Sequence, residues 1–125
     1  FLQYQCVVPP AAAPEVIREL LERIAENRSG SFLAVLKQFG GIASPGMLSF
    51  PRPGVTLALD FANRGVATFA LLDRLDDVVA AAGGAVYPAK DARTSGQRFR
   101  QSFPGWQRFR EYLDPRFSSG FWRRV

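Results

Sequence analysis

The sequence predicts an α+β fold in which two helices pack on one face of a four-stranded antiparallel sheet. Two segments carry apolar residues at helical spacing, and four shorter segments are rich in β-forming residues. They follow one another in the order β-α-β-β-α-β, which is the ferredoxin-like, split-βαβ pattern. A chain of 125 residues is long enough to bury one core.

The first part of the chain contains a strand, a helix and a second strand. Residues 1–8 form the first predicted strand, which ends at Pro9-Pro10 because proline cannot donate to a ladder. Pro14 suits the first turn of a helix that runs to about Asn27 and has one apolar face. After a turn at residues 28–30, the second predicted strand covers residues 31–39.

The second part supplies the remaining elements. A loop rich in Gly and Pro covers residues 40–54, and the third strand follows over 55–61. A second helix is predicted over 66–82, where Gly83-Gly84 ends it, and residues 85–87 form a short fourth strand. Short helices are expected around 97–103 and 106–113. We therefore divide the chain into a ferredoxin-like domain, 1–90, and a C-terminal arm, 91–125.

Alternation of side chains along the strands predicts which face of the sheet is free. The helices need an apolar partner, so they should cover the set that contains Tyr4, Leu36 and Leu57. The free face then carries Gln3, Gln5, Val35, Lys37, Phe39, Thr56 and Ala58. Such a mixed surface suits the floor of a site for a polar ligand, or it is a solvated face of an antiparallel sheet. Lys90, after the fourth strand, either holds an anionic group or is a solvated charge.

Composition excludes several kinds of site. The chain has no His and one Cys, which excludes a Ser-His-Asp triad, an intrachain disulfide and most zinc sites, so no metal is expected. The net charge is +5, and residues 90–125 hold nine basic and three acidic side chains. Such an arm could bind nucleic acid, a membrane surface or an acidic partner, or lie against a neighbouring domain. The chain has no initiator Met and starts within a strand, so we expect a longer parent polypeptide.

Five segments of the sequence follow one another in this order: Leu2–Pro9, Ser31–Gly40, Leu48–Pro51 with Pro53-Gly54, Tyr87–Asp91, and Asp114–Ser119 with Arg123-Arg124. Together they resemble the C-terminal part of FAD-linked oxidases of the vanillyl-alcohol-oxidase group. The similarity is greatest to its decaprenylphosphoryl-β-D-ribose 2-oxidase-like and aldonolactone oxidase branches. No Gly-rich phosphate loop follows a strand here, so the FAD-binding domain is expected outside this chain.

The resemblance implies that residues 1–90 are the substrate (cap) domain of a longer enzyme and that the arm, 91–125, docks on its FAD-binding domain. The parent would be an FAD-dependent oxidoreductase that oxidises a secondary alcohol of a sugar or sugar lactone by hydride transfer to flavin N5. Lys90 would lie near the flavin pyrimidine edge with Gln3 close by, and Lys37 would be the catalytic group near the reacting hydroxyl. Substrate contacts are implied for Gln5, Val35, Lys37, Phe39, Thr56 and Ala58. Ala58 stands where the mycobacterial enzyme has a cysteine, which excludes thiol chemistry at that position.

The implied partners are a sugar or sugar-lipid substrate and the FAD-binding domain, which would hold most of the FAD. The fragment alone is expected to be inactive and to bind no FAD tightly. A cytoplasmic location is expected, with a membrane-peripheral one as the alternative. If the arm docks on the absent domain, its aromatic residues should be partly exposed or covered by self-association. These residues are Phe99, Phe103, Trp106, Phe109, Phe117, Phe121 and Trp122.

Two readings of other classes remain beside this one. The chain could be a ferredoxin-like small-ligand-binding or protein-interaction module without catalysis, including a dimerisation domain. An RNA-binding domain of this fold should show paired aromatic residues on its central strands. The third strand offers Thr56 and Ala58 instead, so no nucleic-acid partner is expected.

Overall fold

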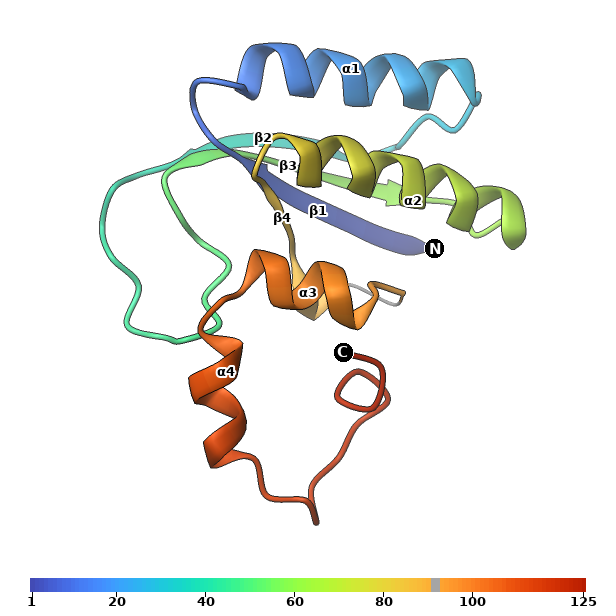
Figure 1. The fold of residues 1–125 in the computed structure, drawn as a ribbon. Coiled ribbons are helices and arrows are strands. Elements are labelled where there is room, and N and C mark those ends of the chain that lie inside the picture. Colours follow the sequence, from blue (N-terminus) through green and yellow to red (C-terminus); the bar gives the residue numbers. More distant parts are fainter. Residues whose placement is uncertain (91–92) are drawn as a thin grey trace.

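The computed structural model describes residues 1–90 and 93–125. Its first six elements are β1 (Leu2–Val8), α1 (Ala13–Glu26), β2 (Ala34–Phe39), β3 (Gly54–Phe61), α2 (Val66–Ala81) and β4 (Ala85–Val86). The four strands form an antiparallel sheet in the order β2-β3-β1-β4, and α1 and α2 lie side by side over one face (Figure 1). The predicted α+β class and the βαββαβ order are confirmed.

The two long helices start and end where local chemistry requires it. Pro14 lies in the first turn of α1, where its missing N–H is not needed. Beyond the end of α2, Gly83 adopts a left-handed conformation with φ of 72°. The next amide, that of Gly84, donates to the carbonyl of Val79 at 2.8 Å and satisfies one of the last carbonyls of the helix. None of the helices in the described part of the chain is long and apolar enough to cross a membrane.

The main core lies between the sheet and these two helices. Tyr4, Cys6 and Leu57 point toward the helices and are buried, as the alternation predicted for Tyr4 and Leu57. Leu36 belongs to the same face but is 58% exposed, which differs from the prediction. The reason is its position on β2, an edge strand, where it borders an open groove with Ile17 of α1.

The second strand is shorter than predicted: β2 begins at Ala34, and residues 31–33 lie before it. The hydroxyl of Ser31 accepts a hydrogen bond from the backbone N–H of Asp60 at 2.8 Å. A side chain therefore satisfies the end of β3 where a continued ladder would otherwise do so.

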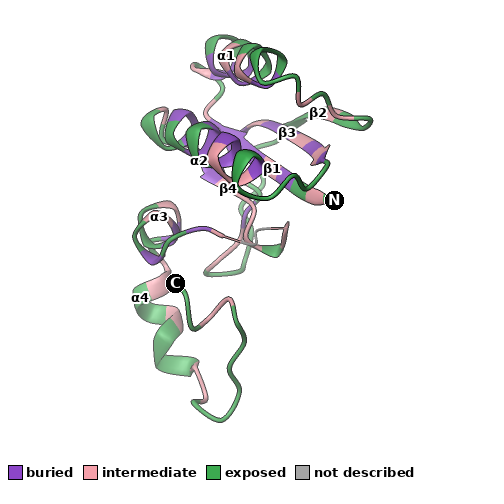
Figure 2. Cartoon of the chain, turned by 90° about the vertical axis from the view of Figure 1, so that its right-hand side faces the viewer, coloured by how far each residue is buried: buried purple, intermediate pink, exposed green. Residues whose placement is uncertain are grey.

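The C-terminal arm lies on the opposite side of the sheet from α1 and α2 (Figure 1). A second cluster of buried residues joins it to that face. Figure 2 shows that burial is greatest in the sheet and declines toward α4 and the C-terminus. The single turn η1 (Pro88–Lys90) precedes the arm, which contains α3 (Gly96–Ser102), α4 (Trp106–Phe109) and η2 (Arg110–Tyr112). The buried members of the second cluster are Val7, Phe50, Ala85, Phe99 and Phe103.

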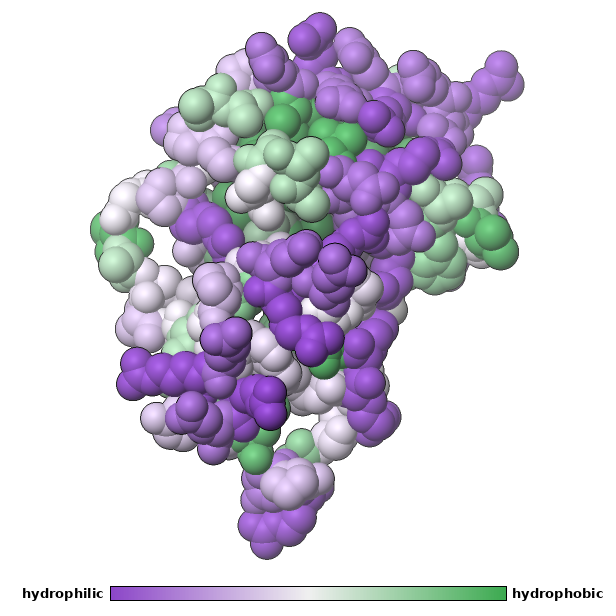
Figure 3. Space-filling view, in the orientation of Figure 1, coloured by the Kyte–Doolittle hydropathy of each residue, from purple (hydrophilic) through white to green (hydrophobic). Residues whose placement is uncertain are grey.

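The expectation that all seven aromatic residues of the arm are partly exposed is wrong for two of them. Phe99 and Phe103 are 2% and 3% exposed, because they cover Val7 and Ala85 on the second face of the sheet. Phe117 is 78% exposed. The other four are half-buried, namely Trp106, Phe109, Phe121 and Trp122. The outer surface is mainly hydrophilic over α1 and the arm, with separate apolar patches between (Figure 3).

Candidate functional site

A hollow of about 120 Å³ lies on the second face of the sheet, at the end that the arm leaves uncovered. Strands β1, β2 and β3 form its floor, and η1 closes one side. The hollow brings together seven of the eight residues that were predicted as site residues. Its lining consists of Gln3, Gln5, Leu33, Val35, Lys37, Thr56, Ala58, Leu59, Asp60 and Lys90.

The register of the sheet explains why these side chains meet. Gln5 of β1 lies opposite Ala58 of β3, which lies opposite Val35 of β2, so all three share one row. In the neighbouring row Thr56 lies opposite Lys37. Residues opposite one another in antiparallel strands point to the same face. The floor is therefore fixed by the pairing of three strands and does not depend on a loop.

A hydrogen bond within the floor orients one of its amides. The Gln5 side-chain nitrogen Nε2 donates to the Thr56 hydroxyl oxygen at 3.1 Å. Thr56 is 1% exposed, while Gln5 is half-buried and reaches the hollow. A buried hydroxyl thus holds the Gln5 carboxamide against the floor, where its other polar atom can meet a ligand.

Both lysines of the chain border this hollow. Lys37 is exposed on the edge strand, and Lys90 is half-buried at the end of η1. Neither forms an ion pair with another residue within the described ranges 1–90 and 93–125. Among the described residues, Asp60 is the single carboxylate of the lining, so these residues give the lining a formal charge of +1. Such a surface suits a polar or anionic ligand.

The position of Lys90 follows from the shortness of β4. This strand pairs with β1 only at Cys6 and Val7, and the chain then leaves the sheet beside Gln5. The Tyr87 N–H donates to the Gln5 carbonyl at 2.8 Å, and the Lys90 N–H donates to the Tyr87 carbonyl at 3.2 Å. The single turn of η1 therefore carries Lys90 along the open edge of β1 to the border of the hollow.

Phe39 is the predicted site residue that does not line the hollow. Its ring packs edge-on against Phe50, with centroids 6.0 Å apart. Phe50 in turn stacks on Tyr87 at 4.6 Å. As the last residue of β2, Phe39 lies next to the loop that carries Phe50 and joins the second cluster beneath the arm.

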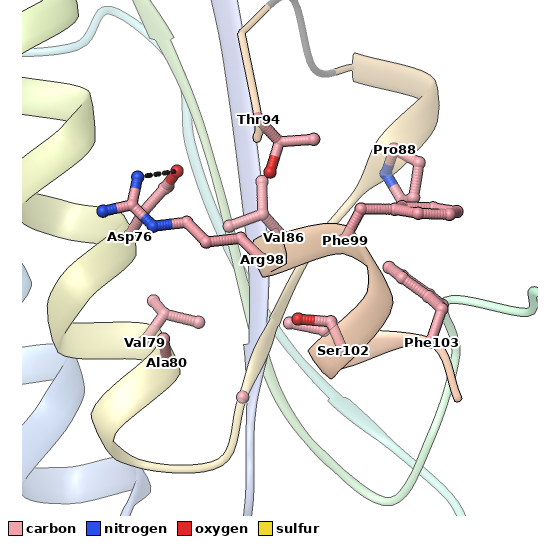
Figure 4. Close-up of a pocket in the computed structure, with 12 residues that line it drawn as sticks. Asp76, Val79, Ala80, Val86, Pro88, Thr94, Arg98, Phe99, Ser102 and Phe103 are labelled. Carbon is pink, nitrogen blue, oxygen red and sulfur yellow. Dashed lines mark ion pairs between the residues drawn. The ribbon is translucent and has the colours of Figure 1, made fainter. Parts of the chain in front are cut away.

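Sequence reasoning missed a buried charge network between α2 and the arm. Arg93 donates to both carboxylate oxygens of Asp76, each at 2.9 Å, and also contacts Asp73 at 2.5 Å. Arg98 of α3 pairs with Asp77 and reaches Asp76 at 3.7 Å. Figure 4 shows the ion pair between Arg98 and Asp76 beside a water-sized crevice of about 20 Å³ between α2, β4 and α3. The basic excess of the arm is thus partly matched by acidic residues of α2.

The electrostatics of this network follow from burial and pairing. Burial lowers the pKa of Arg93, but hydrogen bonds and attraction to Asp76 and Asp73 outweigh it and raise the pKa overall. Tyr4 lies on the core side of β1, and its hydroxyl is buried without a hydrogen bond to any described residue. Burial, followed by the nearby Cys6 and Asp76, raises the pKa of Tyr4 well above its usual value.

Comparison with known proteins gives relatives that are much longer than this chain. No family model matches it. It is 39% identical, over its whole length, to 28% of the decaprenylphosphoryl-beta-D-ribose oxidase of Mycolicibacterium smegmatis, in the C-terminal part of that protein. It is also 39% identical, over 98% of its length, to 34% of an uncharacterized protein in the mprA 5′ region of Streptomyces coelicolor. The chain is thus a homologue of the C-terminal part of an oxidase and spans about a third of the length of these relatives.

Proposed function

We propose that this chain forms the substrate side of a longer FAD-linked oxidoreductase, which oxidises a secondary alcohol of a sugar, a sugar lactone or a sugar lipid. One observation carries the proposal. The residues for which the family resemblance implies flavin and sugar contacts lie, apart from Phe39, around a single hollow on an open sheet face. Homology over the whole chain to an oxidase that is named for a ribose substrate supports the same conclusion.

The donor set of the hollow fits both ligands that the proposal requires. When bound, the flavin would accept the hydride and its reduced ring would carry negative charge. Lys90 has no carboxylate partner among the described residues and would place a cation at the edge of that ring, with Gln3 next to it. A fixed cation near developing negative charge is an effective form of electrostatic stabilisation.

The remaining residues of the floor would orient the sugar. Lys37 reaches the hollow from the edge strand and would hydrogen-bond the reacting hydroxyl. Gln5, held by Thr56, offers an amide to a second hydroxyl. Val35 and Ala58 lie in the row of Gln5 and supply an apolar surface for the carbon skeleton of the sugar. A few fixed polar groups on an apolar floor are typical of small-molecule sites.

The outer surface of the arm supports the proposed contact with an FAD-binding domain. Trp122 stacks on Trp106 and on Phe109, with both centroid distances 5.5 Å, yet all three rings are only half-buried. Phe117 is largely exposed. Apolar rings that gather on one surface without being covered are typical of a contact area for another domain.

The test uses the flavin-loaded, full-length polypeptide, with decaprenylphosphoryl-β-D-ribose and a set of aldonolactones as substrates. Lys37→Ala should cut the rate of flavin reduction by substrate while leaving flavin content unchanged. Lys90→Ala should slow reduction and weaken flavin retention. Loss of a charge-assisted bond typically costs about 1.5–3 kcal/mol, or about ten- to a hundredfold in rate or affinity.

Arg18→Ala is the matched control, because Arg18 is an exposed cation on α1, on the far side of the sheet. It should leave both flavin content and turnover unchanged. If both lysine variants oxidise the substrates as fast as the parent, the site assignment is wrong. A full-length protein that binds these sugars but carries no flavin would instead favour a binding module without catalysis.

A further inference from the structure

A buried ion pair fixes the chain three residues after Lys90. The Arg93 guanidinium donates to both carboxylate oxygens of Asp76 at 2.9 Å, in the bidentate arrangement that gives the strongest and most directional pairing. The Asp76 side chain is 2% exposed and that of Arg93 is 11% exposed. Asp73 contacts the same guanidinium from the surface.

An ion pair in this place is better suited to fixing position than to adding stability. Removing two charges from water costs free energy, and well-packed apolar residues of similar volume often stabilise a fold equally well. The ion pair fixes the orientation of Arg93 on α2 more tightly than apolar contacts would, because the two parallel hydrogen bonds of the guanidinium form in a single orientation. It therefore determines where the chain beyond η1 meets the helix.

Lys90 lies between two such fixed points. Before it, the Tyr87 N–H donates a hydrogen bond to the Gln5 carbonyl of β1. After it, Arg93 is bonded to α2. Lys90 and Arg93 also border the same narrow crevice, together with Gln3 and Gln5 of β1. Residues 87–90 continue along the edge of β1 beyond the short strand β4, and they place Lys90 beside the hollow.

We propose that Asp76 and Arg93 are positioning residues that clamp the segment carrying Lys90 at the edge of the hollow. The clamp itself is a property of this chain. Its purpose, to hold a cation against a negatively charged ring, rests on the proposed function. The two parts of the proposal can therefore be tested separately.

The first experiment needs no ligand. Lys37 and Lys90 are the only lysines, so a ¹⁵N-lysine-labelled sample of the 125-residue chain gives two backbone amide signals. In Arg93→Gln and Asp76→Asn, the Lys90 signal should move toward its random-coil position and lose its heteronuclear NOE, because one of the two anchors is gone. The Lys37 signal, on β2, should stay in place and report that the sheet is intact.

Arg116→Gln is the matched control, because it removes another paired arginine of the arm, whose partner is Asp114 and not the carboxylates of α2. It should leave both signals in place. If a buried variant fails to fold, Asp73→Asn weakens the clamp from its exposed side and should shift the Lys90 signal alone, by a smaller amount. A folded Arg93→Gln or Asp73→Asn protein with an unchanged Lys90 signal would overturn the clamp.

The second experiment measures the midpoint potential of the flavin in the full-length polypeptide by dye equilibration. Lys90→Ala should lower the potential, since a cation favours the negative reduced ring. Arg93→Gln should lower it in the same direction, but should add nothing in the Lys90→Ala background, because it acts only through Lys90. Independent, additive effects of the two substitutions would overturn the positioning role. A potential unchanged by Lys90→Ala would refute the proposed flavin contact while leaving the clamp, tested by NMR, in place.

Discussion

The two ends of the second sheet face differ in what covers them. At one end Val7 and Ala85 are apolar, and Phe99 and Phe103 from the arm bury them. At the other end the floor contains glutamines, a threonine and a lysine, and the arm does not extend over it. The difference shows that the chain covers the apolar end of this sheet face and leaves the polar end open. Covering an apolar floor removes apolar surface from water and so stabilises the fold. Covering a polar floor would take its polar groups away from the water to which they hydrogen-bond, which costs free energy unless a ligand replaces that water.

The largest expected effect lies at the covered end. Phe99 is 2% exposed and contacts four other aromatic rings, so Phe99→Ala should lower the free energy of unfolding by about 3–5 kcal/mol. Urea unfolding followed by far-UV circular dichroism measures this. Phe117→Ala is the control, because Phe117 is 78% exposed, and it should change stability by no more than about 0.5 kcal/mol. Equal effects of the two substitutions would show that the arm is not part of the folded unit.

The next effect concerns pH and the helix-covered face. Burial raises the pKa of Cys6 from 9.0 to about 12. Above pH 9 the unfolded chain therefore releases a proton that the folded chain keeps. Stability is fully present below that pH and falls as pH rises, by about 1.4 kcal/mol per pH unit until the pH reaches the folded pKa. Above pH 10 Tyr4 adds a second loss of the same sign, since its pKa is raised from 10.0.

Urea unfolding between pH 8 and pH 10.5 checks this slope. Cys6→Ala removes the titrating thiol and should make stability nearly independent of pH between about 9 and 10. Its stability at pH 8 provides the reference for the small cavity that the substitution creates. A slope that is unchanged in Cys6→Ala would mean that other groups cause the alkaline loss.

A smaller effect is expected within the open end. Thr56→Val keeps the shape of a buried side chain but removes the hydroxyl that accepts the Gln5 hydrogen bond. The loss should be about 1 kcal/mol, because Gln5 is half-buried and water can replace part of the bond. Gln5→Ala and the double variant complete a double-mutant cycle. A coupling energy near zero would show that the hydrogen bond does not fix the carboxamide.

Much of the open end could be predicted from the sequence because a strand has a period of two. Placing Tyr4 and Leu57 toward the helices forces Gln3, Gln5 and Ala58 to the other face, whatever the loops do. The alternation of side chains does not predict which segment covers that face of the sheet. Burial of the arm residue Phe99 depends on the path of the chain after the sheet, which no local pattern specifies.

The charge network between α2 and the arm was not predicted from the sequence, for a related reason. The arm showed an excess of basic residues, which indicated a partner of opposite charge but not its location. Its nearest partner is the acidic face of α2, and the signal was the spacing of Asp73, Asp76 and Asp77 on one helix. Asp76 falls on the buried side of that helix, and a carboxylate there requires a buried cation. A search for charged residues on the apolar side of the predicted helix could have found this position.

The smallest expected effect on stability separates the two ends most clearly. Lys37 and Lys90 border the hollow but form no ion pair within the part of the chain that the structure describes. Lys37→Ala and Lys90→Ala should therefore change the free energy of unfolding by no more than about 0.5 kcal/mol each. Residues that matter for a ligand and not for the fold should show this combination of little structural cost and a large loss of activity. If either substitution instead lowers stability by as much as about 3 kcal/mol, comparable to Phe99→Ala, that lysine supports the fold. The open end would then be a second packed region, and the contrast between the two ends would be lost.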